Sequence, residues 1–305
     1  SPRSGVKVTD VLGDPLAPKA FSLIAIHKHG IPYAFNAETL AEGEVAARLP
    51  LSAEHREDLR HLPIVAIDPI DARDHDDAIW AEPDGAGGFR AVVAIADVSF
   101  YVRPGSQLDR EARKRGNSVY FPDRVVPMLP DTLSGDLCSL HEGVDRPCIA
   151  VRMRLDAQGH KIGHRFVRGL MRSAASLHYA EVQAAADGSP NDKCAPLMDH
   201  VIRPLYAAYA AATKARTERQ PLDLDLPERK FVLDDEGKVV SVAFRDRLEA
   251  HKLIEEFMIL ANVAAAEELE RLKRPLLYRV HEEPSADKLD ALREVAQASG
   301  FVLAK

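Results

Sequence analysis

The sequence predicts an α+β fold, and three observations support this class. Apolar runs typical of buried strands come early, at 62–67, 90–95 and 149–155. Alanine-rich and amphipathic segments typical of helices dominate the later part of the chain. The sequence contains no internal repeat or low-complexity tract. Strands that come first and helices that come later are typical of α+β folds rather than of sheets built from alternating strands and helices.

The first 61 residues carry weaker signals than the rest. Residues 6–12 alternate like a short strand, and residues 14–18 predict a turn. A mostly helical stretch follows, broken at residues 30–32 and at Pro50. We therefore expect a strand and then a helical connector ahead of the main sheet.

Two hairpins and four helices are predicted after the first strands. Residues 156–159 predict the turn between the strands 149–155 and 161–167, and residues 234–237 predict a second turn. The helices are expected at 178–186, 194–219, 246–273 and 285–299. In the third helix, the residues at helical spacing that predict a buried face are Leu253, Phe257, Leu260 and Ala264.

Composition excludes several classes of protein. Apolar residues make up 46% of the 305 residues, which is enough for a sizeable core. No stretch approaches the roughly 18 uninterrupted apolar residues of a membrane span, and the N-terminus lacks a secretory signal pattern. We therefore expect no membrane partner. The cysteines Cys138, Cys148 and Cys194 have no C-x-x-C spacing, so buried free thiols in a reducing cytoplasm are expected.

The net charge of −7 argues mildly against a nucleic-acid surface that covers the whole molecule. Two basic clusters could still form local patches. The first contains Arg110, Arg113, Lys114 and Arg115, and the second contains Arg165, Arg168 and Arg172. Such clusters are more typical of a solvated face than of a phosphate contact.

The segment Asp68-Pro-Ile-Asp-Ala-Arg-Asp-His-Asp-Asp77 carries the strongest chemical signal. It places five carboxylates in one short turn directly after an apolar run. Like charges a few ångströms apart repel and cost stability, and a divalent cation removes that cost. Oxygen ligands without a nearby cysteine or histidine pair favour Mg²⁺, with Mn²⁺ as a substitute, over zinc. The simplest chemistry for such a site is metal-assisted phosphoryl or phosphodiester chemistry.

Other interpretations of this acidic segment fit less well. An acidic turn by itself is most often solvated surface. A calcium loop that begins at Asp74 needs Gly at its sixth position and Glu at its twelfth, where the sequence has Ile79 and Gly85. A phosphatase-type Asp-x-Asp motif fails because Ile70 stands where the second acid is needed. The remaining spacing, Asp-x5-Asp-x-Asp-Asp, is specific.

In this spacing the sequence resembles the ribonuclease II/ribonuclease R exoribonucleases, within their catalytic RNB domain. The segment from Ile67 to Ala78 closely resembles the family signature. Five further segments match in the same order, and they are Val93–Val102, Ser118–Pro122, Val126–Pro130, Leu133–Leu140 and Ala250–Asn262. The likeness extends from Leu62 to Pro284 and is nearer to the ribonuclease R branch.

The resemblance implies a domain order. Residues 62–305 are expected to form the N-terminal half of the mixed RNB catalytic fold. The end of a cold-shock-type β-barrel (1–13) and a helical connector (14–61) are expected before it. Family members continue with the second half of the RNB domain, which carries an Arg-rich motif and a catalytic Glu, and with an S1-type domain. We therefore expect the remainder of the same polypeptide to be a partner of this part. Without it, apolar surface is expected to be exposed along the 246–273 helix and around the hairpin at Asp156.

The resemblance also implies an activity and a metal site. The implied activity is that of a Mg²⁺-dependent 3′→5′ exoribonuclease. It degrades single-stranded or structured RNA processively from a single-stranded 3′ end to nucleoside 5′-monophosphates. By motif match, Asp68 and Asp77 are the expected direct metal ligands. Asp74 and Asp76 complete the site, one of them holding a second ion or its waters and the other orienting the attacking water.

Three residues are implied as RNA contacts. Tyr120 matches an aromatic residue that packs on the 3′-terminal nucleotide, and Tyr179 matches another near the scissile end. Glu255 matches a carboxylate that contacts the terminal nucleotide. Stacking on an aromatic ring contributes about 1–3 kcal/mol per base and needs no particular sequence. The chain departs from the family pattern at Leu224, where many relatives have a Phe opposite the tyrosine.

Two other residues of the acidic segment are expected to be structural. A salt bridge to Arg73 is the expected role of Asp71. His75 is expected to point away from its neighbours, because the turn is assumed to be extended.

Two rival functions remain open. One is an RNB-like module that binds RNA without cutting it, against which the presence of all four acids speaks. The other is an unrelated metal phosphohydrolase that acts on small molecules. Labelled single-stranded RNA with Mg²⁺ separates the three hypotheses, which predict a ladder, a shifted band and untouched RNA respectively.

Overall fold

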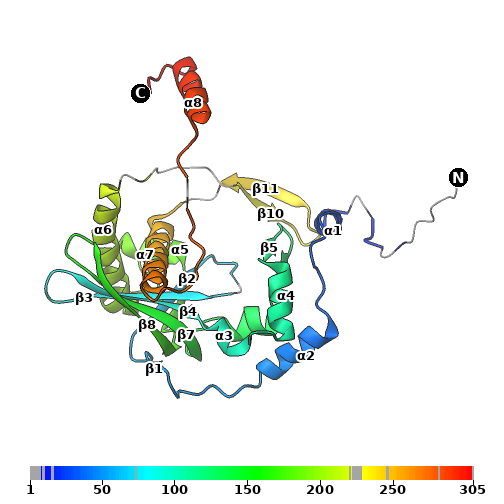
Figure 1. The fold of residues 1–305 in the computed structure, drawn as a ribbon, viewed down its shortest axis with the longest axis horizontal. Helices are drawn as coiled ribbons and strands as arrows, with labels where there is room; N and C mark the ends of the chain where they lie inside the picture. Colours follow the sequence, from blue (N-terminus) through cyan, green and yellow to red (C-terminus); the bar gives the residue numbers. More distant parts are fainter. Residues whose placement is uncertain are drawn as a thin grey trace. The chain divides into compact units, whose positions relative to one another are not determined.

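A mixed sheet of seven strands forms the centre of the larger unit of the chain (Figure 1). The computed structural model describes residues 8, 11–14, 17–72, 74–219, 221, 229–244, 247–280 and 282–303. The chain divides into two compact units, Ser1–Ala261 and Asn262–Lys305. The strand order is β1-β8-β7-β4-β3-β2-β9. With helices packed against this sheet, the α+β class predicted from the sequence is confirmed.

The strands of the sheet are β1 (Glu57–Asp58), β2 (Val65–Asp68), β3 (Asp77–Pro83), β4 (Phe89–Ala96), β7 (Asp145–Leu155), β8 (Lys161–Arg172) and β9 (Ala175–His178). Two antiparallel pairs lie outside it, namely β5 (Val119–Tyr120) with β6 (Val125–Val126) and β10 (Arg229–Leu233) with β11 (Val239–Phe244). Within the sheet, β1 with β8 and β2 with β9 are parallel, and the other neighbours are antiparallel. The predicted strands and both hairpin turns are confirmed, although the first strand begins only at Val65. The strand predicted at 6–12 lies largely outside the described residues.

The helices are α1 (Ala20–Lys28), α2 (Ala37–Ala46), α3 (Val98–Tyr101), α4 (Gln107–Arg115), α5 (Tyr179–Ala186), α6 (Arg203–Glu218), α7 (Glu249–Arg271) and α8 (Ala286–Ala298). Irregular helical turns occupy η1 (Thr132–Leu137), η2 (Ala195–Leu197) and η3 (Met198–Ile202). The helix predicted at 194–219 is therefore regular only from Arg203, and Pro204 in its first turn favours a helix start there. Among the described residues, no helix has the length and apolar character that a membrane span requires.

Both faces of the sheet are buried. Alternate strand residues such as Trp80, Val92 and Ala150 form one core face with Leu108 of α4. The residues between them, such as Val93, are also buried, and helices α5, α6 and α7 lie over that second face (Figure 1). Strand residues that are apolar on both sides explain the near-continuous apolar runs of the sequence.

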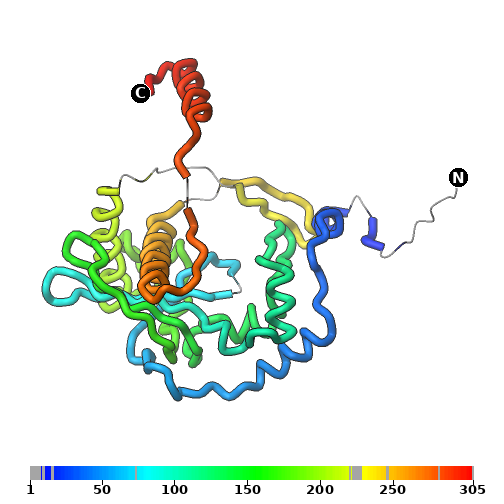
Figure 2. Tube along the Cα trace, viewed as in Figure 1, coloured from blue at the N-terminus to red at the C-terminus, as the bar shows by residue number. Residues whose placement is uncertain are grey.

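Helix α7 buries its apolar residues as its spacing predicted. Leu253, Phe257 and Leu260 are all buried. The expectation that apolar surface would be exposed along this helix is therefore wrong for these positions. Exposed apolar side chains gather instead on the β10–β11 hairpin, whose tip accepts a hydrogen bond from Lys19 Nζ at Asp235 O. This contact joins the hairpin to the start of α1, and Figure 2 shows the two segments side by side.

Asp97 is a buried carboxylate directly after β4, at the sheet edge that carries the acidic segment. Its Oδ2 lies 2.8 Å from Arg56 Nη2 and 3.1 Å from Arg168 Nη1, and Ser99 Oγ donates to its Oδ1 at 2.6 Å. Burial alone raises the pKa of a carboxyl group, but Ser99 and the two guanidinium groups outweigh this effect and lower the pKa of Asp97. The network ties the end of β4 to β8 and to the residue before β1.

The Asp97→Asn substitution should lower the free energy of unfolding by about 3–5 kcal/mol, because it leaves the buried Arg56 guanidinium without a counter-charge. The matched control is Asp145→Asn, which removes a more exposed partner of Arg60 and Arg172 and should cost about 1 kcal/mol or less. Urea unfolding of the three proteins measures both changes. Equal effects in the two variants would contradict a special role for the Asp97 network.

Candidate active site

The acidic segment connects two adjacent antiparallel strands, β2 and β3. Strand β2 ends at Asp68 and β3 begins at Asp77, so both carboxylates lie at the same edge of the sheet. Strand β9 runs parallel to β2 and pairs His178 with Asp68, which brings the start of α5 to this edge. Strand β4 ends here as well, with Ile95 opposite Asp77. The topology therefore gathers the ends of four strands around the predicted acids.

Hydrogen bonds to the backbone hold the second half of the segment in place. The Ala96 amide donates to the carbonyl oxygen of Asp76 at 2.9 Å. The His75 amide donates to Ser139 Oγ at 3.0 Å, and its carbonyl oxygen accepts from the Leu140 amide at 2.7 Å. A loop whose backbone is bonded to its neighbours holds its side chains in defined positions. The matching segment that ends at Leu140 therefore supports the acids directly.

The four aspartates differ in exposure. Asp68 is buried, Asp77 is half-buried, and Asp74 and Asp76 are exposed at the mouth of the cluster. Burial, together with the charges of Asp76 and Asp68, raises the pKa of Asp77 to about 7. Loss of hydration raises the pKa of Asp68 despite the opposing effect of His75. Loss of water around the carboxylate, followed by the charge of Asp74, raises the pKa of Asp76. The cluster therefore holds its negative charge at a cost in free energy.

His75 contacts Asp68, so the prediction that it points away from its neighbours is wrong. Its Nδ1 lies 2.6 Å from Asp68 Oδ2. Hydrogen bonds from both backbone groups of His75 to the segment that ends at Leu140 fix the backbone from which this side chain reaches Asp68. The predicted pairing of Asp71 concerns Arg73, which lies outside the described residues. Asp71 itself lies 3.6 Å from Lys230 Nζ.

The donor set of the cluster suits a hard divalent cation. Its four side chains offer only carboxylate oxygens, which Mg²⁺ and Mn²⁺ prefer. In the part of the chain that the structure describes, no lysine or arginine forms an ion pair with Asp74, Asp76 or Asp77. In the same part, no group of three or more His, Cys, Asp or Glu side chains is arranged to hold an ion. His75 contacts only Oδ2 of Asp68, so the other oxygen of this carboxylate is left for a cation while the imidazole holds the group in place.

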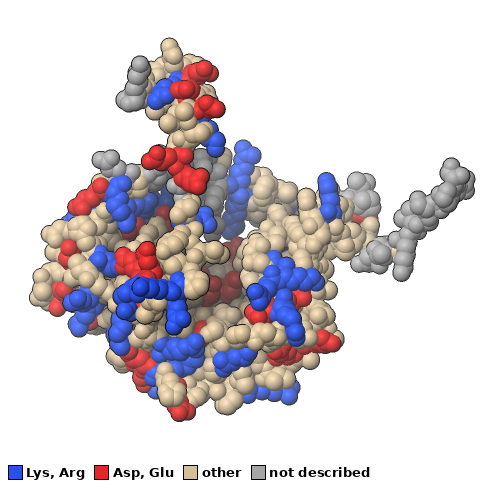
Figure 3. Space-filling model, viewed as in Figure 1, with Lys and Arg blue, Asp and Glu red and all other residues tan. Residues whose placement is uncertain are grey.

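Tyr120 lies beside the acids. It ends the short strand β5, it is 67% exposed, and its hydroxyl oxygen lies 3.5 Å from Asp74 Oδ2. Figure 3 shows red carboxylate atoms recessed in this face, where Figure 1 draws the β2–β3 connection. An exposed aromatic ring next to recessed acids is a suitable platform for a base.

Tyr179 starts α5, one residue after the end of β9, and so lies near the acidic edge. Its ring stacks on His251 of α7, with centroids 4.0 Å apart and planes at 20°. One face of the Tyr179 ring is therefore occupied by the protein itself. Leu224, the position that departs from the family pattern, lies outside the described residues.

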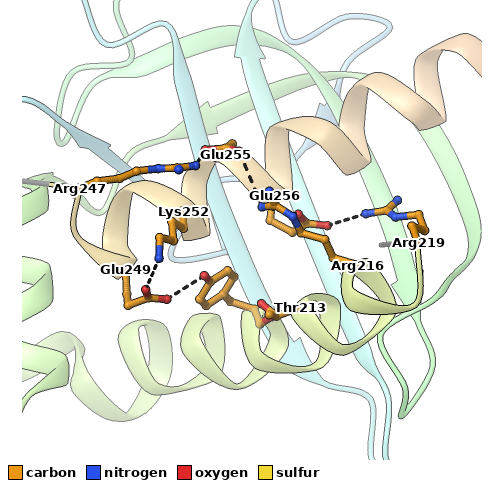
Figure 4. A network of polar contacts seen from close by, with 9 residues as sticks. Thr213, Arg216, Arg219, Arg247, Glu249, Lys252, Glu255 and Glu256 are labelled. Carbon is orange, nitrogen blue, oxygen red and sulfur yellow. Dashed lines mark hydrogen bonds and ion pairs between the residues drawn. The ribbon is translucent and has the colours of Figure 1, made fainter. Parts of the chain in front are cut away.

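Glu255 is part of a polar network between α6 and α7 (Figure 4). Its two carboxylate oxygens lie 2.8 Å from Arg247 Nη2 and 3.7 Å from Arg216 Nη1. The neighbouring Glu256 is buried, and Arg216 and Arg219 flank it at 3.6 and 3.3 Å. The structure thus brings together the four acids and Tyr120, whereas Glu255 is engaged by arginines.

Sequence analysis missed two residues that contact this site. Ser139 binds the His75 backbone, and His178 pairs with Asp68 across strands β9 and β2. Both residues lie in segments that the sequence singled out. However, Ser139 and His75 are 64 residues apart in the chain, and local patterns carry no signal for such a contact.

The mixed sheet and the acids at its edge define an RNB-type domain, and the family model described as RNB domain matches residues 56–303. The chain belongs to the RNB-domain family, as its sequence segments implied. Ribonuclease R of Escherichia coli is 42% identical over 303 residues, which cover 97% of this chain and 37% of the relative. Ribonuclease R of Aquifex aeolicus is 36% identical and covers 99% of this chain and 43% of the relative. The chain spans about two fifths of the length of these curated relatives.

Solved structures share the fold. Mycoplasma genitalium RNase R in complex with ribose-methylated single-stranded RNA has a TM-score of 0.89 and 29% identity, and the match covers 95% of this chain and 46% of that one. Yeast Ssd1, described as a pseudonuclease, has a TM-score of 0.66 and 21% identity, covering 84% of this chain and 32% of that one. The second likeness concerns the fold alone. It shows that this fold also occurs in a protein described as a pseudonuclease, so activity must be argued from the acids.

Proposed function

We propose that this chain carries the metal-binding acids of a Mg²⁺-dependent 3′→5′ exoribonuclease that degrades RNA processively to nucleoside 5′-monophosphates. The observation that carries the proposal is the acidic edge, where four aspartates meet and the pKa of Asp77 is raised to about 7. Carboxyl groups whose pKa is raised to near neutral pH are typical of functional sites. The family assignment sets aside the rival interpretation as an unrelated phosphohydrolase.

In this proposal the two buried or half-buried acids and the two exposed acids have different tasks. Asp68 and Asp77, at the ends of adjacent strands, hold the ion from the floor of the cluster. Asp74 and Asp76, which are exposed, complete the site, one of them holding a second ion or its waters and the other orienting the attacking water toward the scissile phosphate. His75 keeps its contact with Asp68 Oδ2 and positions that carboxylate. When bound, Mg²⁺ or Mn²⁺ would neutralise these carboxylates and stabilise the charge that develops on the leaving oxygen.

The RNA contacts follow from the same geometry. Tyr120 stacks on the 3′-terminal base beside Asp74. Tyr179, which His251 holds from one side, contacts the strand with its remaining surface near the scissile end. Glu255 contacts the terminal nucleotide with its carboxylate, and Arg247 and Arg216 position that carboxylate. None of these contacts reads a base edge, which suits degradation without sequence preference.

A cleavage assay with the full-length protein tests the proposal. RNA labelled at its 5′ end should be shortened from the 3′ end to short oligomers in Mg²⁺, with few intermediate lengths because degradation is processive and with nucleoside 5′-monophosphates released, and it should stay intact in EDTA. The alternative of an RNA-binding module without cleavage has one supporting observation: among the described residues, no group of three or more His, Cys, Asp or Glu side chains is arranged to hold an ion. A shifted band of intact RNA in Mg²⁺ would favour that alternative and contradict the proposal.

A further inference from the structure

Helix α4 carries two different faces. Leu108, Glu111 and Arg115 are buried and follow one stripe of the helix. A second stripe, formed by Arg110, Arg113 and Lys114, is exposed. These three residues are called the α4 basic face below. The predicted basic cluster is therefore divided, because its fourth member, Arg115, points into the protein.

The buried charges of α4 are satisfied within the protein. Arg115 Nε lies 2.9 Å from Glu111 Oε1, and its other nitrogens donate to the carbonyl oxygens of Pro127 and Ala34 at 3.0 Å. The guanidinium group also lies 3.7 Å from the centre of the Phe35 ring. These contacts anchor the helix and leave little negative charge to balance its exposed side.

The two basic clusters of the sequence differ in their partners. In the cluster on β8, Arg165 pairs with Glu57 at 2.7 Å, and Arg172 pairs with Asp145 at 2.7 Å. Arg168 of the same cluster pairs with Asp97. By contrast, Arg110 and Arg113 form no ion pair with any residue that the structure describes, and Lys114 lies 3.9 Å from Glu111, which Arg115 already neutralises. Of these two clusters, the α4 basic face is therefore the one that presents unbalanced positive charge.

The α4 basic face lies next to the candidate active site. Helix α4 ends at Arg115, and five residues later the chain reaches Tyr120, whose hydroxyl oxygen lies 3.5 Å from Asp74 Oδ2. Lys114 comes six positions before Tyr120, so the Cα atoms of the two residues are at most about 20 Å apart. Figure 3 shows blue side chains over α4, beside the recessed red atoms of the acids.

The acids that pack near α4 lie at its other end. Glu38 and Glu42 of α2 bond to Gln107 and to the amide of Leu108, in the first turn. Asp109 bonds to the Gly105 amide before the helix. The positive charge is thus greatest at the end of α4 that leads into Tyr120.

We propose that the α4 basic face contacts the phosphates of the RNA strand just before its 3′ end reaches Tyr120 and the acids. The inference rests on the proposed function, and it adds a binding surface to it. An anionic backbone is the occupant that unbalanced cations beside a base-stacking ring would select. Because the contact is made to phosphates, it should be independent of base sequence and sensitive to salt.

Cations in a last helical turn also stabilise the helix end, and this provides a competing explanation of Arg113 and Lys114. The two explanations differ in what salt does to RNA binding. A phosphate contact releases counterions from RNA when it forms, whereas a purely structural cation does not. The dependence of RNA affinity on salt therefore distinguishes them.

The test uses the full-length protein carrying Arg110→Gln and Arg113→Gln, since Gln keeps a high helix propensity. Affinity for a labelled single-stranded oligoribonucleotide is measured in EDTA over a range of NaCl concentrations. The slope of log Kd against log salt should fall by about 1.4, that is, about 0.7 for each phosphate that the variant no longer neutralises. The charge-preserving variant Arg110→Lys/Arg113→Lys should keep the parent slope.

The matched control is Arg203→Gln/Lys214→Gln, which removes two exposed cations from α6 over the other face of the sheet. It should bind RNA with the parent slope. If the α4 double variant also keeps the parent slope, or if the parent binds no RNA, the inference is overturned. If the parent binds RNA and the α4 variant shows the reduced slope, but the RNA stays intact in Mg²⁺, the proposed exonuclease function fails while the α4 surface stands.

Discussion

The Asp76→Asn substitution in the full-length protein is expected to lower the rate of RNA cleavage by about 10²–10³-fold, the usual effect of removing one positioned polar group from an active site, because the amide can no longer hold a second ion or orient the attacking water with a negative charge. Asp76 is exposed at the mouth of the acidic cluster, and its backbone is held by Ala96. The substitution keeps the shape of the side chain and removes one negative charge. RNA affinity should stay within a few-fold of the parent, because stacking and phosphate contacts supply it elsewhere.

The matched control for this prediction is Asp71→Asn. It is the same substitution in the same acidic segment, but Asp71 is exposed and lies near Lys230 rather than in the cluster. Its cleavage rate should match that of the parent. A rate above a tenth of the parent value for Asp76→Asn would contradict the task assigned to Asp76.

The second large effect concerns stability, pH and metal. In EDTA, Asp77 should destabilise the protein increasingly as the pH rises. Its pKa in the folded protein is raised to about 7 from an ordinary value of 3.8, so the folded state binds the proton more tightly than the unfolded state. The favourable contribution of the protonated group is complete below pH 3.8 and is lost as the pH rises through about 7. Each pKa unit corresponds to about 1.4 kcal/mol, so the loss amounts to a few kcal/mol.

Thermal unfolding of the parent and of Asp77→Asn over this pH range isolates the contribution of Asp77. In EDTA at neutral pH the variant should be the more stable protein, and the difference should vanish in acid. Mg²⁺ should raise the melting temperature of the parent at neutral pH. At a hundredfold excess of Mg²⁺ over its Kd, binding should add about 2.7 kcal/mol to the free energy of unfolding. Identical melting curves for the parent in Mg²⁺ and EDTA at low salt would show that the acids do not hold a metal.

Features that rest on local pattern could be predicted from the sequence. The apolar runs, the hairpin turn at 156–159 and the spacing of Leu253, Phe257 and Leu260 each reflect contacts between residues near in the chain. The four acids could be grouped for the same reason, because one short segment contains all of them. The assignment of Tyr120 needed the family resemblance, since one exposed aromatic residue has no pattern of its own.

Features that depend on distant partners could not be predicted. His75 contacts Asp68, and Ser139 binds the backbone of His75. The spacing of residues in the sequence does not predict a hydrogen bond between segments so far apart. Arg115 looked like a member of an exposed basic cluster, but Glu111 and Phe35 hold it inside. Charge alone does not tell a buried cation from an exposed one, and only the partners supplied by the fold decide between them.

The position of Asp68 and Asp77 at the ends of adjacent strands has a consequence for how the family can vary. Neighbouring strands are about 4.7–4.9 Å apart in any sheet, so hydrogen bonding between β2 and β3 sets the separation of these two residues. The residues between them do not set it. Substitutions at positions such as Ile70 and Ala72 can therefore accumulate without moving the two expected ligands. Only a change in how the two strands pair, in a register that places Val65 opposite Ile79, would alter the separation itself.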